Sequence, residues 1–94
     1  MTKSDLITTL ALRTTIPVTA SEAIISTVFD CMTDALVAGD RIEIRGFGSF
    51  VIKEYDGYTG RNPKTGQEVI IKPKRSPFFK VGKELKARVD SLVN

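Results

Sequence analysis

The stretch Thr59-Gly60-Arg61-Asn62-Pro63-Lys64-Thr65-Gly66 decides the fold, because it places a tight turn between two runs with the pattern of strands. Asn62-Pro63 and Thr65-Gly66 are strong turn signals. Arg61 and Lys64 flank the proline with charges suited to phosphate oxygens. Taken alone, the octapeptide is typical of a plain surface turn. Together with the rest of the chain, it predicts a hairpin tip that contacts an anionic partner.

The segments beside this tip predict a two-stranded arm over residues 55–74. Residues 55–60 lead to the tip and residues 67–73 lead away, with too little apolar surface for a core. Eight or nine residues on each side, at about 3.3 Å per residue, reach roughly 25 to 30 Å. An isolated ribbon is marginally stable in water, so we expect the arm to be mobile until it is bound.

Residues 41–54 and 75–94 predict a sheet and a last helix. Residues 41–45 alternate strictly between charged and apolar, which is typical of a half-buried antiparallel strand. Gly46 and Gly48 flank Phe47 at a turn or bulge before a second strand, residues 77–81 predict a returning strand, and Gly82 precedes the helix. The side chains expected to face inward are Ile42, Ile44, Leu85, Val89 and Leu92.

Residues 1–40 predict two helices that serve as the dimerisation part. Thr2 followed by Asp5 resembles an N-cap for a helix from Lys3 to about Arg13. After Pro17, Thr19 and Glu22 predict a capping box that opens a second helix, and Gly39 stops it. Its apolar face is wider than one neighbouring helix would cover. Cys31 lies on that face and is interpreted as a small core residue.

The length and the aromatic content predict a dimer. A single domain of 94 residues buries only about 60 to 65 % of the surface that its unfolded chain exposes. A marginal monomer is expected, and a partner subunit would supply the missing burial. We expect an obligate, intertwined dimer whose core includes Phe29, Phe47, Phe50 and Phe79.

Composition lowers the expectation of enzymatic and membrane functions. With one cysteine and no histidine, the chain lacks an internal disulfide and the usual catalytic and metal-binding constellations. We therefore expect no enzyme, no catalytic residue, no metal, no cofactor and no small-molecule substrate. No apolar run approaches the roughly 20 residues of a membrane span. A soluble protein of the cytoplasm with no membrane partner fits best.

The charge is distributed unevenly along the chain. Residues 1–40 carry two cations against five anions, a net charge of −3, whereas residues 41–94 carry twelve cations against six anions, a net charge of +6. Such asymmetry is typical of a protein with a polyanionic partner.

Three groups of residues resemble the bacterial HU and integration host factor family of histone-like DNA-bending proteins. They are Gly46-Phe47-Gly48-Ser49-Phe50, then Gly60 to Gly66, then Pro77, Phe79, Gly82, Lys83, Leu85 and Lys86. The resemblance implies an α+β fold for residues 1–94 as a single domain. Its parts are an N-terminal two-helix hairpin, a three-stranded antiparallel sheet with a long protruding β-ribbon arm, and a short C-terminal helix.

The same resemblance implies binding of double-stranded DNA through the minor groove, with bending or compaction of the duplex in the nucleoid. It makes Pro63 the intercalating wedge, with Arg61 and Asn62 as groove contacts. The remaining candidates for DNA contact are Lys64, Lys3, Arg45, Gly46, Lys72, Lys74, Arg75, Lys80, Lys83 and Lys86.

Several alternatives stay open. Glu43 and Arg45 resemble the beta subunit of integration host factor more than HU, so a site-preferring subunit is the alternative to largely sequence-independent binding, our main expectation. A module whose arm pairs with another protein is a further alternative. A homodimer is expected, and a heterodimer with a related subunit is possible.

One other motif is weaker. Arg45 to Val51 approach the signature of an RNA-recognition motif. Ser49 is one residue too many, however, and separates Phe47 from Phe50 by three, which predicts the two rings on opposite faces of a strand.

Overall fold

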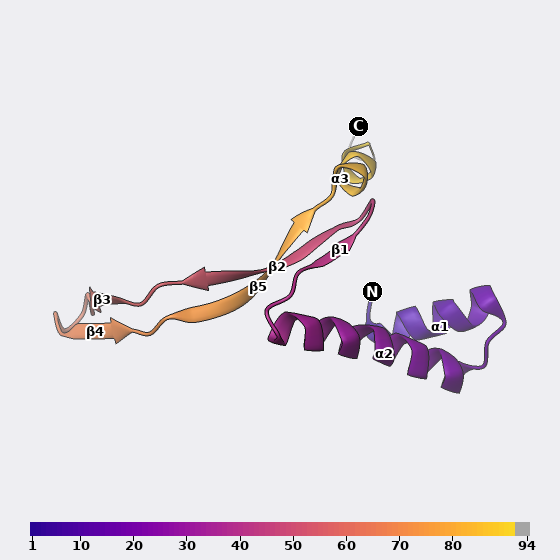
Figure 1. Ribbon diagram of the computed structural model, residues 1–94, viewed down its shortest axis with the longest axis horizontal. Helices are drawn as coiled ribbons and strands as arrows, with labels where there is room; N and C mark the ends of the chain where they lie inside the picture. The colour runs from indigo at the N-terminus through magenta and orange to yellow at the C-terminus, as the bar shows by residue number, and fades with distance from the viewer. Residues whose placement is uncertain (92–94) are drawn as a thin grey trace. The chain divides into compact units, whose positions relative to one another are not determined.

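The computed structural model describes residues 1–91, so Leu92, which was expected to face inward, lies outside the described part. The chain divides into two compact units at Ala38 and Gly39. The first unit contains α1 (Lys3–Thr14) and α2 (Val18–Val37). The second contains, in chain order, β1 (Ile42–Ile44), β2 (Gly48–Tyr55), β3 (Tyr58–Arg61), β4 (Glu68–Ile71), β5 (Lys74–Val81) and α3 (Lys83–Asp90) (Figure 1).

The first unit is a helical hairpin, as predicted. Thr2 and Asp5 form a reciprocal capping box at α1: the Thr2 Oγ1 accepts from the Asp5 N–H at 3.1 Å, and the Asp5 carboxylate accepts from the Thr2 N–H at 2.8 Å. These two bonds satisfy backbone donors that a helix start leaves unpaired. The helix ends where Thr15 adopts a left-handed backbone with φ of 56°.

The predicted capping box at Thr19 and Glu22 is wrong. The N-cap of α2 is Pro17, with φ −54° and ψ 149°, and no side chain caps it. The fixed φ of the proline ring positions the chain for helix entry at once. Thr19 therefore lies inside the first turn and not at its cap. At the other end Gly39 takes φ of 89°, which confirms it as the stop signal.

The second unit is built on a three-stranded antiparallel sheet in the order β1-β2-β5. The pairing of β2 with β5 runs without interruption from Gly48 opposite Val81 to Tyr55 opposite Lys74. Beyond this pairing, β3 and β4 form a separate two-stranded ribbon. This ribbon lies at one end of the unit and α3 at the other (Figure 1), which agrees with the predicted sheet, arm and terminal helix.

Three aromatic rings meet on the sheet. The ring centroid of Phe79 lies 5.4 Å from that of Phe47 and 4.9 Å from that of Phe50. The expectation that Phe47 and Phe50 lie on opposite faces is therefore wrong. Phe47 belongs to the turn before β2, where its N–H donates to the Ile44 carbonyl at 2.9 Å, so strand alternation does not govern its direction.

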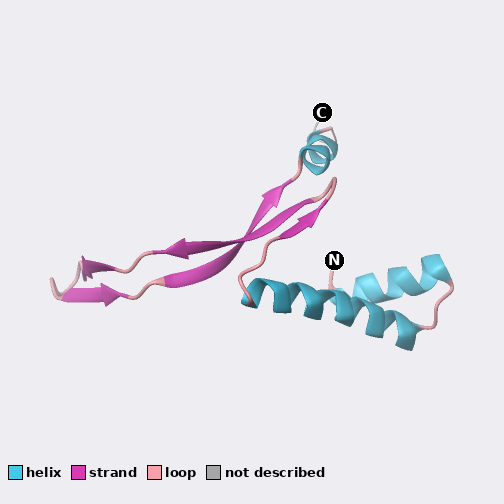
Figure 2. Ribbon diagram, viewed as in Figure 1, coloured by secondary structure: helices cyan, strands magenta, loops and turns pink. Residues whose placement is uncertain are grey.

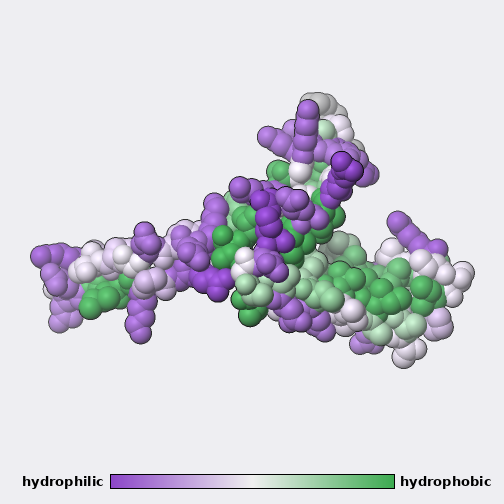
Figure 3. Space-filling model, in the orientation of Figure 1, coloured by the Kyte–Doolittle hydropathy of each residue, from purple (hydrophilic) through white to green (hydrophobic). Residues whose placement is uncertain are grey.

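A single chain buries very little. Among residues 1–91 no apolar side chain is fully buried, and Ser21 is the largest side chain that is. Ile44 and Val89, expected to face inward, are exposed, and so is Cys31, interpreted from the sequence as a core residue. Phe29, Phe47 and Phe79 are 42%, 44% and 37% exposed. Figure 3 shows apolar surface spread over the helices of the first unit. A single chain therefore leaves apolar side chains exposed that would otherwise form a hydrophobic core.

We predict that the thermal midpoint of unfolding rises with protein concentration, because a second chain must cover these side chains and association then stabilises the folded state by mass action. Thermal unfolding followed by circular dichroism over a hundredfold range of concentration measures this shift. A constant midpoint together with a folded monomer in sedimentation at micromolar concentration would contradict it.

Candidate nucleic-acid interface

The arm ends in a closed six-residue loop. β3 and β4 pair from Tyr58 opposite Ile71 to Arg61 opposite Glu68. Beyond this pair the Asn62 N–H donates to the Gln67 carbonyl at 2.8 Å, and the Gly66 N–H donates to the Asn62 carbonyl at 2.7 Å. Gly66 adopts φ of 71°, a conformation that a side chain would strain. The loop is therefore fixed by its own backbone.

The side chain of Asn62 orients the proline. Its Oδ1 accepts from the Lys64 N–H at 2.9 Å, which closes an Asx turn around Pro63. Because this bond uses the oxygen, the side-chain NH₂ group is the part of Asn62 available to an external acceptor. Minor-groove base edges are mostly acceptors, so a donor suits them. All residues from Arg61 to Ile70 are exposed.

The arm is interrupted between the sheet and the tip ribbon. Asp56-Gly57 and Lys72-Pro73 separate the Tyr55–Lys74 pair from the Tyr58–Ile71 pair, and Figure 2 shows both segments as loops. Pro73 has no N–H to give to a ladder. A Cβ on Gly57 would lie 2.8 Å from the Ile71 carbonyl oxygen, so the two strands approach closely here. The strand pairing of the tip ribbon is therefore separate from that of the sheet.

The cations at the base of the arm have partners on the paired strands β2 and β5. The Lys74 Nζ lies 5.5 Å from the Tyr55 ring centroid, and the Arg75 Nε lies 3.9 Å from the Glu54 Oε1. The Lys53 Nζ lies 3.6 Å from the Phe78 ring centroid. Exposed pairs of this kind contribute little stability. They place the three cations beside neighbouring side chains of the β2–β5 pair. Lys53 was missed by sequence reasoning, and the basic side chain ending the apolar run of β2 was the signal for it.

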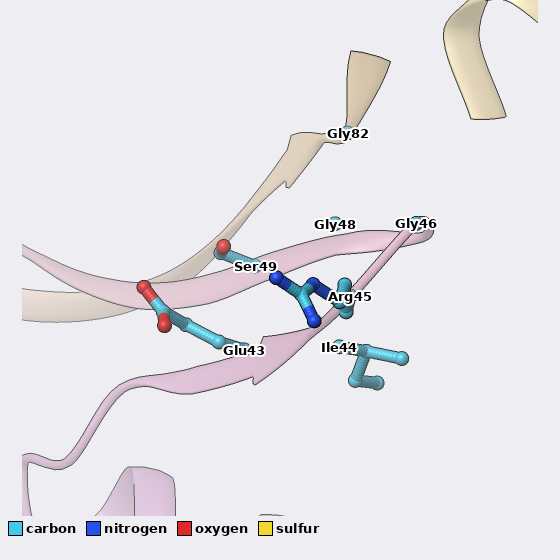
Figure 4. Close-up of a pocket in the computed structure, with 7 residues that line it drawn as sticks. All are labelled: Glu43, Ile44, Arg45, Gly46, Gly48, Ser49 and Gly82. Carbon is cyan, nitrogen blue, oxygen red and sulfur yellow. The ribbon is translucent and has the colours of Figure 1, made fainter. Parts of the chain in front are cut away.

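The β1–β2 hairpin carries a second group of polar side chains. Glu43 lies directly opposite Ser49 in the strand register. Glu43, Arg45 and Ser49 lie on the same side of the hairpin, Ile44 lies on the other, and Gly46 and Gly82 complete the rim of a shallow hollow (Figure 4). Arg41 forms an ion pair with Glu43 at 2.7 Å. The hollow therefore presents a carboxylate, a guanidinium and a hydroxyl together.

The remaining predicted contacts are distributed between the units. Lys72 lies in the arm break, Lys80 lies on β5 opposite Ser49, and Lys83 and Lys86 lie on α3. All four side chains are exposed. Lys3 belongs to the first unit, at the start of α1. The structure therefore gathers the candidates, except Lys3, along the arm, sheet edge and last helix of the second unit.

Residues 1–91 contain no group of three or more His, Cys, Asp and Glu side chains arranged to hold a metal ion. Over the same residues, no helix combines the length and the apolar character that crossing a bilayer requires.

A family model described as bacterial DNA-binding protein matches residues 1–90. The chain belongs to this family. The expected resemblance to HU and integration host factor is confirmed, and so is the expectation that the chain is not an enzyme. The family is described by its binding of DNA, and an HU protein of the same fold has been solved together with DNA, which bears out DNA as an expected partner.

The similar proteins include beta subunits of integration host factor. The subunit from Bordetella parapertussis is 47% identical over 95 residues, spanning 100% of this chain and 80% of the relative. The subunit from Herminiimonas arsenicoxydans is 48% identical over 94 residues, spanning 99% of this chain and 93% of the relative.

Solved structures of HU share the fold. A complex of Anabaena HU with DNA gives a TM-score of 0.82 at 30% identity, covering 95% of this chain and 97% of the HU chain. A mutant of HU from Thermotoga maritima gives 0.69 at 29% identity, covering 95% of this chain and 99% of the HU chain. The α+β fold expected from the sequence is thereby confirmed.

We predict a steep dependence of DNA affinity on salt, because the exposed cations of the second unit would neutralise phosphates and release counterions. For a dimer that contacts about six to ten phosphates, raising the salt from 50 to 200 mM costs about 10³ to 10⁵ in affinity. Fluorescence anisotropy with a labelled duplex measures the slope of log affinity against log salt. A slope near zero would exclude phosphate contacts as the main source of affinity.

Proposed function

We propose that the chain is a subunit of a dimeric, site-preferring DNA-bending protein of the integration host factor type. The observation that carries the proposal is the β1–β2 hairpin, which presents Glu43 and Arg45 on one side beside Ser49. The names of the relatives, at 47% and 48% identity, also favour this function over sequence-independent binding, which was the main expectation from the sequence.

The arm supplies the bend. Its tip places Pro63 between the exposed side chains of Asn62 and Lys64, held by the hydrogen bonds of the loop. An apolar ring at such a tip can enter between two base pairs, unstack them and kink the duplex. Arg61 and the NH₂ group of Asn62 are donors suited to the acceptors of the minor-groove floor. The cations of the sheet and of α3 then contact the phosphates that the bend brings closer.

The hairpin supplies the preference. A guanidinium and a carboxylate on one side of a strand offer a donor and an acceptor together, which base edges and phosphates of one local shape satisfy better than others. The Arg41–Glu43 ion pair restrains the carboxylate further. An isolated cation would bind phosphate wherever it met one. Arg45 and Glu43 together therefore favour particular DNA sites over random duplex.

The partner is a second chain of the same fold. The relatives are called beta subunits, which favours a heterodimer with a related subunit over the expected homodimer. In both assemblies two arms reach one duplex, and Phe29, Phe47, Phe50 and Phe79 are proposed to lie at the surface that the second chain covers. The proposed location is the bacterial nucleoid.

Selection from a pool of random duplexes tests the site preference. The wild-type dimer should enrich a shared sequence, and Arg45→Ala should reduce the preference for that sequence over random DNA by about 1 to 3 kcal/mol, the cost of one specific contact. Arg88→Ala removes a cation from α3 as the matched control and should leave the preference unchanged. Failure of the wild-type protein to enrich any sequence would refute the proposal and leave sequence-independent binding.

We predict that Pro63→Ala lowers the bend angle more than the affinity, because the substitution removes the rigid ring and keeps every cation. Fluorescence energy transfer between the ends of a duplex measures the bend in saturated complexes. Arg61→Ala combined with Lys64→Ala should do the converse, weakening binding and lowering the salt slope by about one per lost phosphate contact. An unchanged bend with Pro63→Ala would show that the proline only closes the hairpin.

A further inference from the structure

The ribbon of β3 and β4 has two faces of different chemistry. Residues directly opposite each other in an antiparallel pair project to the same side. The register therefore divides the ribbon into a tyrosine face and an arginine face. The tyrosine face consists of Tyr58, Gly60, Val69 and Ile71, and the arginine face consists of Thr59, Arg61, Glu68 and Ile70.

The tyrosine face partly covers itself. The Cε2 atom of Tyr58 lies 3.6 Å from the position that a Cβ on Gly60 would take, so the ring leans over the glycine. Ile71, directly opposite Tyr58, is half-buried although the ribbon has only two strands. Val69 is 40% exposed. These contacts stabilise the ribbon itself, and this face carries no charge.

The arginine face leaves an apolar side chain uncovered. Ile70 is 79% exposed, more than Tyr55, Tyr58 or Val69, the other exposed large apolar side chains of the arm. Arg61 lies directly opposite Glu68 on this face, so the two charges oppose each other. The Coulomb attraction of this face for a polyanion is correspondingly small. A face that nevertheless enters a groove needs another source of affinity.

We propose that Ile70 packs against the deoxyribose walls of the DNA minor groove and gives the arm an apolar, salt-independent contact. The inference rests on the proposed function, in which Arg61 occupies the groove, because Ile70 shares its face. Between the charged phosphates and the polar base edges, the sugars present carbon-bound hydrogens. An isoleucine on the flat side of a thin ribbon can cover them, and burying its side chain excludes water from both surfaces.

The test compares Ile70→Ala with Val69→Ala, its neighbour on the opposite face of the same strand. Affinity for one duplex is measured by fluorescence anisotropy at several salt concentrations. Ile70→Ala should weaken binding by about fivefold to thirtyfold, from the apolar area no longer buried, with the salt slope of the wild-type protein. Val69→Ala should change the affinity by less than about threefold.

The outcomes separate this inference from the proposed function. If the wild-type protein binds duplex DNA and Ile70→Ala changes its affinity no more than Val69→Ala does, the contact proposed for Ile70 is refuted and the DNA-binding function stands. A loss with Ile70→Ala that changes the salt slope would likewise contradict an apolar contact. If the wild-type protein itself does not bind duplex DNA, the proposed function fails first.

Discussion

Residues 1–91 of a single chain bury no apolar side chain completely, although the sequence is 41% hydrophobic. Apolar burial is the dominant favourable contribution to folding, so most of it must be gained between chains. The exposed rings of Phe29, Phe47 and Phe79 and the uncovered positions of α2 are the surfaces available for it. In such an assembly folding and association are coupled, because the free energy of unfolding includes the free energy of association.

This constraint also explains how the chain can extend an arm. If the core is shared by two chains, β2 and β5 can continue past it, and the tip ribbon needs only its own backbone pairing and the small cluster around Tyr58. At Gly57 and Pro73 the strand pairing is interrupted, so the ribbon and the sheet are separately hydrogen-bonded. In the proposed assembly two chains would present two arms to one duplex, and a wedge at each tip would produce a larger bend than one wedge.

Much of the fold could be predicted because its signals are local. The Thr2–Asp5 capping box, the Gly39 stop and the Asn62–Gly66 turn each need only neighbouring residues. The predictions were wrong where several local signals competed, or where a feature depends on contacts between residues far apart in the sequence. The N-cap of α2 is Pro17, so Thr19 lies within the helix and cannot cap it. The turn that contains Phe47 directs its ring toward Phe79. The pairing of arm cations with Tyr55, Glu54 and Phe78 depends on strand register, which one sequence does not specify. Cys31 lies on the apolar pattern of α2 but is exposed in a single chain, because the helical pattern alone does not specify which surface covers it.

Native mass spectrometry of the protein bound to a duplex that holds one binding site tests the central claim most directly. That claim is that two chains share a core and act on one site as a single DNA-binding unit. We expect every complex to contain two chains per duplex, down to the lowest protein concentration at which a complex is detected. A stable complex of one chain with one duplex, at any concentration in that range, would contradict it.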